Sequence, residues 1–322
     1  MTEQTFNWSD ITTLVPTQIE KKTALPPHYT LRVATIVGIK TTVGRFMPVS
    51  HEGESNETYV DKVDLLGAQR AEFIARKMKA IERRQHMRLF RELTEKHTQK
   101  KWGEVFKGWF KLPCEIPDGQ CTLCWNDSLF GSLMPGKGAT FSRARYFDTY
   151  SLEDAGQCVA QLGSEEGIAV GNTVGEDLSK GRGDASLHFY EYVKPGTHFP
   201  FITVIEGPTL LDVAGLLNAI TLADSHGYGK YSANTGKFQT EILAISSGVP
   251  RFSVLDMLEW AAEAGPDGDP VAPIRQQFNP DKPGIVFEDN VHENVVTLFG
   301  EDTEALRTQL DAEFKKYVGA LS

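Results

Sequence analysis

The sequence lacks the features that mark membrane proteins and secreted proteins. No run of 18 apolar residues occurs in its 322 residues, so we expect no transmembrane helix. The first ten residues contain neither a basic segment nor an apolar segment, so we expect no secretory signal. Four cysteines are too few for a disulfide scaffold in a chain of this length. We therefore expect a cytoplasmic protein that contacts no membrane.

Several common catalytic motifs are also missing. The glycine-rich stretch from His226 to Lys237 lacks the spacing of a nucleotide-binding P-loop, and it precedes a predicted strand rather than a helix. No G-x-S-x-G or H-E-x-x-H motif occurs, and the eight histidines are scattered singly. We therefore expect binding rather than catalysis.

Acidic residues outnumber basic residues in the chain as a whole, but basic residues are concentrated in one segment. The net charge is -10, which argues against broad affinity for nucleic acid. Residues 70–91 nevertheless carry eight basic residues against Glu72 and Glu82, a net of +6, which leaves -16 for the rest. A local basic patch on an acidic protein suits a confined phosphate contact, and a solvated helix face is the alternative.

The second half of the chain contains a characteristic order of elements. Two runs of alternating apolar residues at 187–193 and 199–205 predict a β-hairpin, because the turn-forming sequence Lys-Pro-Gly-Thr separates them. A helix from Pro208 to Ile220, the glycine-rich loop and a strand at 238–245 follow. This order is most of a ferredoxin-like sheet.

A strand and a long basic helix are predicted in the first third. Residues 30–39 are rich in β-branched residues and predict a strand, and residues 65–97 show helical periodicity. On a helical wheel an apolar arc opposes an arc of arginine and lysine, and three apolar residues interrupt the basic arc: Phe73, Met87 and Phe90. Exposed apolar groups among arginines would suit base stacking, although they could equally pack under a neighbouring segment.

The cysteines suggest a metal site. Cys121 and Cys124 form a C-x-x-C pair, the spacing of half a zinc knuckle, and Cys114 lies nearby. The candidates for a fourth ligand are Cys158, His97, His86 and Asp127. A redox C-x-x-C pair and plain reduced cysteines are the alternatives, although a βαβ context for a redox motif is not apparent.

Four segments, taken in order, carry a resemblance to a known family. They are Met78–Arg88, Cys114 to Gly131 with its C-x-x-C pair, Pro195–Phe201 and Gly227–Lys237. Together they resemble the RAMP superfamily of CRISPR proteins, and within it the backbone subunit of Cascade complexes, most of all the subtype I-D member. Members of this subtype look richer in metal-ligand cysteines, whereas this chain has Asp127 three residues after Cys124.

The resemblance implies an α+β fold with a ferredoxin-like (RRM-like) palm and inserted finger and thumb segments. The expected organisation is an N-terminal extension at 1–29, a palm from 30–105 and 186–250, a finger and thumb insertion with the candidate zinc site at 106–185, and a C-terminal helical segment at 251–322.

The function implied by the resemblance is binding of guide RNA (crRNA). Copies of the chain would polymerise along the crRNA, together with other Cascade subunits, and present it for pairing with invading DNA or RNA. In one alternative the subunit also cuts the paired strand, as an endoribonuclease or endodeoxyribonuclease, with Asp61 or Asp64 as the catalytic acid. A second alternative is an RNA-binding protein unrelated to CRISPR.

The expected site residues follow from the basic and glycine-rich segments and from the cysteines. We expect structural zinc as the cofactor, bound by Cys114, Cys121 and Cys124. The expected RNA contacts are Arg45, Arg76, Lys77, Arg83, Arg84, Arg88, Arg143, Arg145, Lys180, Arg182, Tyr228, Lys230 and Lys237.

Overall fold

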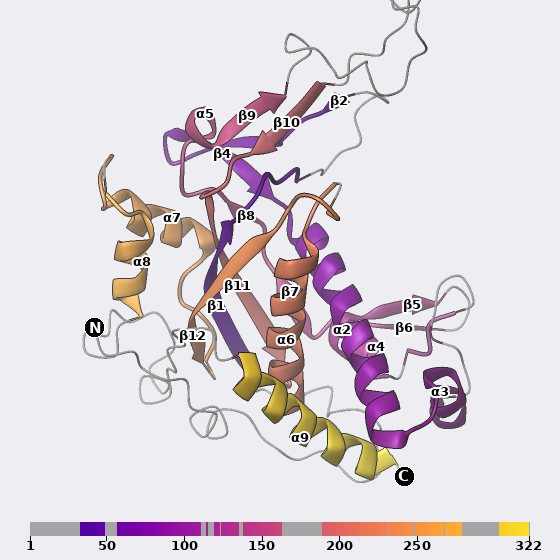
Figure 1. Cartoon of the computed structure of the whole chain (residues 1–322). Coiled ribbons are helices and arrows are strands. Elements are labelled where there is room, and N and C mark those ends of the chain that lie inside the picture. The colour runs from indigo at the N-terminus through magenta and orange to yellow at the C-terminus, as the bar shows by residue number, and fades with distance from the viewer. Residues whose placement is uncertain are drawn as a thin grey trace, which may run out of the picture.

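The protein has a mixed α+β fold with mainly antiparallel sheets (Figure 1). The computed structural model describes residues 33–48, 57–110, 114, 119–122, 124–134, 138–162, 189–230, 232–246, 248–266, 268–278 and 303–321. The described strands are β1 (Val33–Thr42), β2 (Glu57–Thr58), β3 (Lys62–Leu65), β4 (Ala68–Phe73), β5 (Ser132–Met134), β6 (Gly138–Thr140), β7 (Ala144–Tyr146), β8 (Thr149–Tyr150), β9 (Val159–Leu162), β10 (Phe189–Val193), β11 (His198–Glu206) and β12 (Phe238–Ser246). The described helices are α2 (Ala75–Thr98), α3 (Trp102–Phe110), α4 (Trp125–Phe130), α5 (Ala155–Cys158), α6 (Leu210–His226), α7 (Val254–Ala262), α8 (Val271–Gln277) and α9 (Thr303–Leu321).

A four-stranded antiparallel sheet forms the centre of the fold. Its strand order is β12-β1-β11-β7, and β1 pairs with β11 on one side and with β12 on the other. Along the chain the elements that build this layer come as strand β1, helix α2, strands β7 and β11, helix α6 and strand β12. Both long central strands are almost completely buried, because helices cover both faces of the sheet.

The two faces of β1 contribute to two different cores. Ala34 and Ile36 belong to the core shared with α2 and α6, whereas Val37 and Ile39 belong to the core shared with α7 and α8. Successive residues of a strand point to opposite faces, so an unbroken apolar run is what a strand covered on both faces requires.

A buried ionic cluster joins α2 to the sheet. The Lys40 ammonium lies 3.3 Å from a carboxylate oxygen of Glu82, and both side chains are at most 1% exposed. The Glu82 carboxylate also accepts hydrogen bonds from the hydroxyl groups of Tyr146, at 2.7 Å, and Tyr228, at 2.9 Å. One carboxylate on α2 therefore holds side chains from β1, from β7 and from the loop after α6.

The predicted hairpin at 187–205 is wrong, although both of its strands form. Strand β10 pairs with β2 and β9, whereas β11 pairs with β1 and β7. The end of β1 and the chain after it separate the two strands. The backbone of Phe46 hydrogen-bonds to that of Val193, and the backbone of Thr42 hydrogen-bonds to the turn at Gly196 and Thr197. Alternation along each strand predicts a strand but does not specify its neighbour.

The predicted helix at 65–97 begins ten residues too early. Residues 62–73 form the hairpin of β3 and β4, which turns at Leu66 and Gly67. Both turn residues have positive φ, 53° and 76°, as expected in a two-residue turn of type I′. The rest of the predicted helix is confirmed as α2.

Some predictions concern parts of the chain outside the described residues. These are the N-terminal extension at 1–29 and the basic residues Lys180 and Arg182. Among the described helices, none combines the length and the apolar character that crossing a bilayer requires.

Candidate metal centre and nucleic-acid interface

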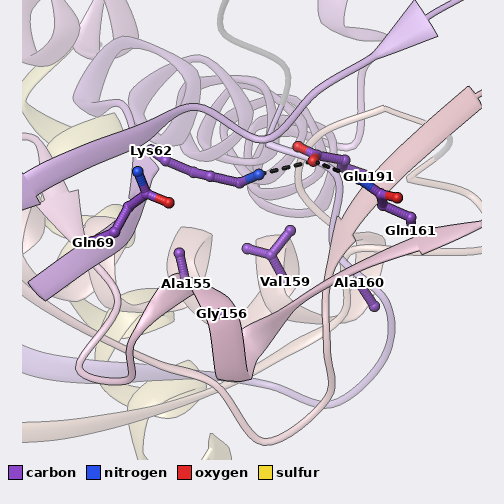
Figure 2. Close-up of a pocket in the computed structure, with 8 residues that line it drawn as sticks. All are labelled: Lys62, Gln69, Ala155, Gly156, Val159, Ala160, Gln161 and Glu191. Carbon is purple, nitrogen blue, oxygen red and sulfur yellow. Dashed lines mark hydrogen bonds and ion pairs between the residues drawn. The ribbon is translucent and has the colours of Figure 1, made fainter.

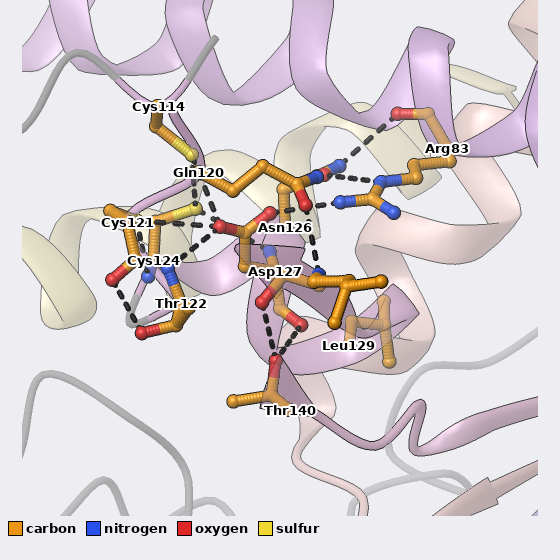
Figure 3. Close-up of polar contacts among 12 residues, drawn as sticks. Arg83, Cys114, Gln120, Cys121, Thr122, Cys124, Asn126, Asp127, Leu129 and Thr140 are labelled. Atoms are coloured by element: carbon orange, nitrogen blue, oxygen red, sulfur yellow. Dashed lines mark hydrogen bonds and ion pairs between the residues drawn. The ribbon is translucent and has the colours of Figure 1, made fainter. Parts of the chain in front are cut away.

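Three cysteines and one aspartate come together at the start of α4 (Figure 3). Cys124 is the residue before the helix, and its sulfur accepts a hydrogen bond from the backbone N–H of Asp127 at 3.4 Å. The sulfur of Cys121 accepts from the N–H of Cys124 at 3.2 Å. Cys114 and Thr122 have positive φ, so the chain bends sharply around the thiols. We call Cys114, Cys121, Cys124 and Asp127 the cysteine cluster.

Three distances between potential ligand atoms of the cysteine cluster are close to those of a tetrahedral metal site. The sulfurs of Cys114 and Cys124 are 3.6 Å apart. Oxygen Oδ2 of Asp127 lies 3.2 Å from the Cys114 sulfur and 3.5 Å from the Cys121 sulfur. With zinc bonds of about 2.3 Å to sulfur and about 2.0 Å to oxygen, neighbouring ligand atoms of a tetrahedron lie about 3.3–3.8 Å apart. All four side chains are buried, so the cluster could hold a metal ion away from solvent.

The cluster is electrostatically unfavourable in its ionised form. Burial, together with hydrogen bonds to the neighbouring cysteines, raises the pKa of the Cys124 thiol well above its usual value. Burial also raises the pKa of Asp127 to about 6, with a further contribution from Cys114. A divalent cation would offset this cost, because it stabilises the thiolates and the carboxylate that coordinate it.

A second layer of contacts fixes the orientation of Asp127. Arg83 of α2 donates to Oδ1 of Asp127 at 2.9 Å and to Oδ1 of Asn126 at 3.2 Å. Asn126 in turn donates to the backbone oxygen of Arg83 at 3.1 Å. Oδ1 of Asp127 is thus held by Arg83 while Oδ2 faces the thiols (Figure 3).

The structure selects one of the four candidates for the fourth ligand, namely Asp127. The others lie elsewhere: the thiol of Cys158 contacts Ser151, a ring nitrogen of His97 lies 3.0 Å from Asp311, and one of His86 lies 3.0 Å from Asn126. In the sequence, Asp127 looked like a departure from the cysteine-rich pattern of the family. In the structure it completes the cluster.

The predicted basic face of α2 divides into exposed and buried parts. Four of the predicted contacts are exposed to solvent, and we call them the basic face of α2: Arg76, Lys77, Arg84 and Arg88. Arg83 is set apart because it is bound to Asp127. Phe73 and Phe90 are almost fully buried, so they pack in the core and are not free to stack on bases.

Several other predicted RNA contacts are structural residues. Arg143 is 3% exposed and forms an ion pair with the buried Asp212. Tyr228 is fully buried, so its ring presents no surface to a base. Lys237 donates to two backbone oxygens of its own loop, and Arg145 is exposed but paired with Glu206 at 2.6 Å. The burial of Arg143 and Tyr228 conflicts with their prediction as contacts.

Arg45 and Lys230 come together beside two tyrosines of β10. The Arg45 guanidinium lies 4.9 Å from the centre of the Tyr192 ring, and the Lys230 ammonium lies 5.8 Å from that of Tyr190. Both tyrosines are half-buried. Neither tyrosine was among the predicted site residues, although their alternation in 187–193 already indicated that they share one face of a strand.

The two candidate catalytic acids, Asp61 and Asp64, are close in sequence to Lys62, which lines a small cavity. Asp64 is an exposed residue of β3, paired with Gln69 of β4, and Asp61 comes just before β3. Among the described residues, neither belongs to a group of three or more side chains that could hold a metal. The cavity, of about 340 Å³, is lined by residues that include Lys62 and Glu191 (Figure 2). These two side chains form an ion pair at 2.8 Å, so their charges offset each other.

Comparisons with known proteins identify the family. The Csc2 Crispr family model matches residues 31–316. The crystal structure of Thermofilum pendens Csc2 covers 97% of this chain and 96% of its own, with 16% identity and a TM-score of 0.54. A chain of a CRISPR RNA-guided surveillance complex covers 87% of this chain and 99% of its own, with 13% identity and a TM-score of 0.50. Because the sequence identities are low, these two similarities show a shared fold and nothing more. A comparison with curated protein sequences gave no match. The family match spans nearly the whole sequence, and the chain belongs to the Csc2 Crispr family.

Proposed function

We propose that this chain is the backbone subunit of a type I CRISPR interference complex, where it binds crRNA. The observation that carries the proposal is the basic face of α2, which exposes four positive charges on a chain of net charge -10. Membership of the Csc2 Crispr family supports the same role, as does the shared fold with a chain of an RNA-guided surveillance complex. Its partners are then crRNA, other Cascade subunits, further copies of itself and the target nucleic acid, in the cytoplasm.

The central sheet with α2 and α6 is the ferredoxin-like (RRM-like) palm of this proposal. In that fold two strand-helix-strand units form a sheet of order 4-1-3-2. The order β12-β1-β11-β7 corresponds to it when β1, β7, β11 and β12 are counted as strands one to four. Strand β7 lies within residues 106–185, so the palm takes its edge strand from the segment that the sequence assigned to the finger and thumb.

The basic face of α2 binds RNA through its phosphates. Arginine and lysine side chains on one exposed helix face contact a backbone without reading its sequence. Lys230, at the rim of the glycine-rich loop, adds a further positive charge. Because the protein holds the backbone, the base edges of the guide remain available for pairing, and specificity comes from that pairing.

The cysteine cluster is a structural zinc site in this proposal. Three thiolates and a carboxylate suit zinc, and three of the distances between their ligand atoms are close to those of tetrahedral coordination. Bound zinc would offset half of the negative charge of the ionised ligands and cross-link the loop of Cys114 to α4. Arg83 would hold the Asp127 carboxylate in place, and this contact connects the site to α2.

Charge reversal on α2 tests the proposed RNA contact. Arg84→Glu with Arg88→Glu should weaken binding of single-stranded RNA and reduce the slope of log affinity against log salt by at least about 1.4, because two phosphate contacts are lost. Arg307→Glu is the matched control, since Arg307 is an exposed arginine on α9 whose contact with Glu92 is long, at 4.0 Å. A double variant that melts normally and binds RNA with unchanged affinity and salt slope would refute the proposal.

A further inference from the structure

The two faces of β10 have opposite characters. Glu191 and Val193 are buried, and Glu191 points into the cavity beside Lys62 (Figure 2). Side chains alternate along a strand, so Tyr190 and Tyr192 lie on the other face. There both remain partly accessible, with the tyrosine rings covered by the cations of Lys230 and Arg45.

The backbone holds these cations in position. Gly236 donates to the backbone oxygen of Arg45 at 2.6 Å, and Lys230 donates to that of Met47 at 3.1 Å. The next residue after Arg45 is Phe46, which pairs with the end of β10 at Val193. The two loops and the strand are therefore bound to one another by main-chain hydrogen bonds, and the cations reach the tyrosines from anchored positions.

Arg45 and Lys230 offer different chemistry over similar rings. A guanidinium is planar, so Arg45 can stack on Tyr192 with one face and on a base with the other. An ammonium is a compact charge with three donors, which suits a phosphate oxygen more than a base. A planar cation and a point charge beside two aromatic rings are the parts from which sites for single-stranded nucleic acid are built.

The spacing of the tyrosines favours bases that are not stacked on each other. Residues two apart in a strand are separated by about 6.6 Å, whereas neighbouring stacked bases are separated by about 3.4 Å. Arg45 and Lys230, each over one of these rings, thus suit nucleotides that are drawn apart, as single-stranded RNA on proteins commonly is.

We infer that Arg45, Tyr192, Tyr190 and Lys230 form a stacking site for single-stranded RNA, in which an unpaired base lies on Arg45 over Tyr192 and a phosphate lies at Lys230. This inference rests on the proposed function, because it takes RNA as the ligand. It adds base stacking on β10 to the phosphate contacts of α2.

Paired RNA probes separate base stacking from phosphate binding. The full-length chain is titrated with a fluorescent single-stranded 20-nucleotide oligo(A) and with an abasic RNA of the same length. Tyr192→Leu removes the ring that supports the Arg45 guanidinium, so it should weaken oligo(A) binding by about fivefold, at the low end of the loss of a base stack, and leave abasic binding unchanged. Arg45→Lys keeps the charge but removes the plane, so it should also lower oligo(A) affinity selectively.

Two further variants serve as controls. Tyr192→Phe retains the ring and should bind both probes like the unmodified chain. Lys230→Met should weaken both probes equally and reduce the salt slope by about 0.7, because only a phosphate contact is lost. Melting temperatures are measured for every variant, and the exposed Arg45 keeps the test valid if Tyr192→Leu does not fold.

The outcomes distinguish this inference from the proposed function. If Tyr192→Leu and Arg45→Lys leave the ratio of oligo(A) to abasic affinity unchanged, the stacking site is overturned while RNA binding by α2 stands. If Tyr192→Leu is unfolded, an unchanged ratio for Arg45→Lys alone overturns it. If the unmodified chain binds neither probe, the proposed function and the stacking site fall together.

Discussion

Neighbouring arginines on α2 should have separable roles. Replacing Arg83 by methionine should loosen zinc binding at the cysteine cluster and leave RNA binding intact, whereas Arg84→Met should do the opposite. Methionine retains an apolar stem at each position, so the comparison removes the guanidinium with little change in packing. The reason for the contrast is that Arg83 is bound to Asp127 and Asn126, whereas Arg84 points into solvent.

The expected magnitude follows from the contacts of Arg83. Loss of a residue that orients a metal ligand typically lowers metal affinity by 10- to 100-fold, which is about 1.4–2.7 kcal/mol. The Arg83 side chain is 28% exposed, so solvent screens part of its interaction with Asp127. We therefore expect about a tenfold loss, in the lower part of the range. Arg83→Lys should fall in between, because lysine keeps the charge but not the fork that reaches both partners.

Zinc and RNA affinities are measured on the same preparations. Zinc-loaded full-length protein is titrated with a chromophoric chelator, and single-stranded RNA binding is followed by fluorescence anisotropy in excess zinc. Arg84→Met should reduce the RNA salt slope by about 0.7 and retain zinc like the unmodified chain. Equal zinc affinity for Arg83→Met and Arg84→Met, in folded proteins, would refute the orienting role of Arg83.

Two predictions concern stability. Burial lowers the pKa of His86 to about 3, so this residue takes up a proton below pH 6.5 in the unfolded chain but not in the native chain. The contribution of His86 to stability should therefore fall by about 2 kcal/mol from pH 7 to pH 5. Urea unfolding at both pH values checks this, and a His86→Gln variant with the same pH dependence would contradict it. Gly236→Ala should destabilise the chain by at least about 2 kcal/mol, because Gly236 has φ of 68° and an added Cβ would lie 1.9 Å from the Tyr228 oxygen. Gly44→Ala is its control, since an added Cβ there meets nothing within 4 Å, and equal melting temperatures for the two variants would show that the loop tolerates a side chain.

Local patterns in the sequence predicted most of the central elements. The strands β1 and β12 and the helices α2 and α6 lie close to where periodicity and turn residues placed them. The pairing of β10 and β11 could not be predicted in the same way. It depends on Phe46, more than 140 residues away in sequence, which occupies the backbone groups of Val193.

The site was less predictable because its side chains are divided by tertiary contacts. A helical wheel places Arg83 with Arg84, yet Asp127, 44 residues further on, takes Arg83 out of the solvent-facing set. Tyr228 stands in a glycine-rich loop, a context typical of exposed tyrosines, but its hydroxyl group bonds to the buried Glu82. The three cysteines were found from their spacing. Asp127 was one of four candidates until the fold brought it within 3.5 Å of two sulfurs.

The buried carboxylate of Glu82 also determines the rotational orientation of α2 about its own axis. An apolar surface alone would allow the helix to rotate about this axis, since one aliphatic contact can replace another. Glu82 permits only the angle at which Lys40, Tyr146 and Tyr228 all reach it. At about 100° per residue, Arg84 lies about 160° around the helix from Glu82, and Arg88 lies about 120° around. The buried contacts of Glu82 thus fix the direction in which Arg84 and Arg88 point. Every copy of the chain along an RNA would present these charges at the same angle.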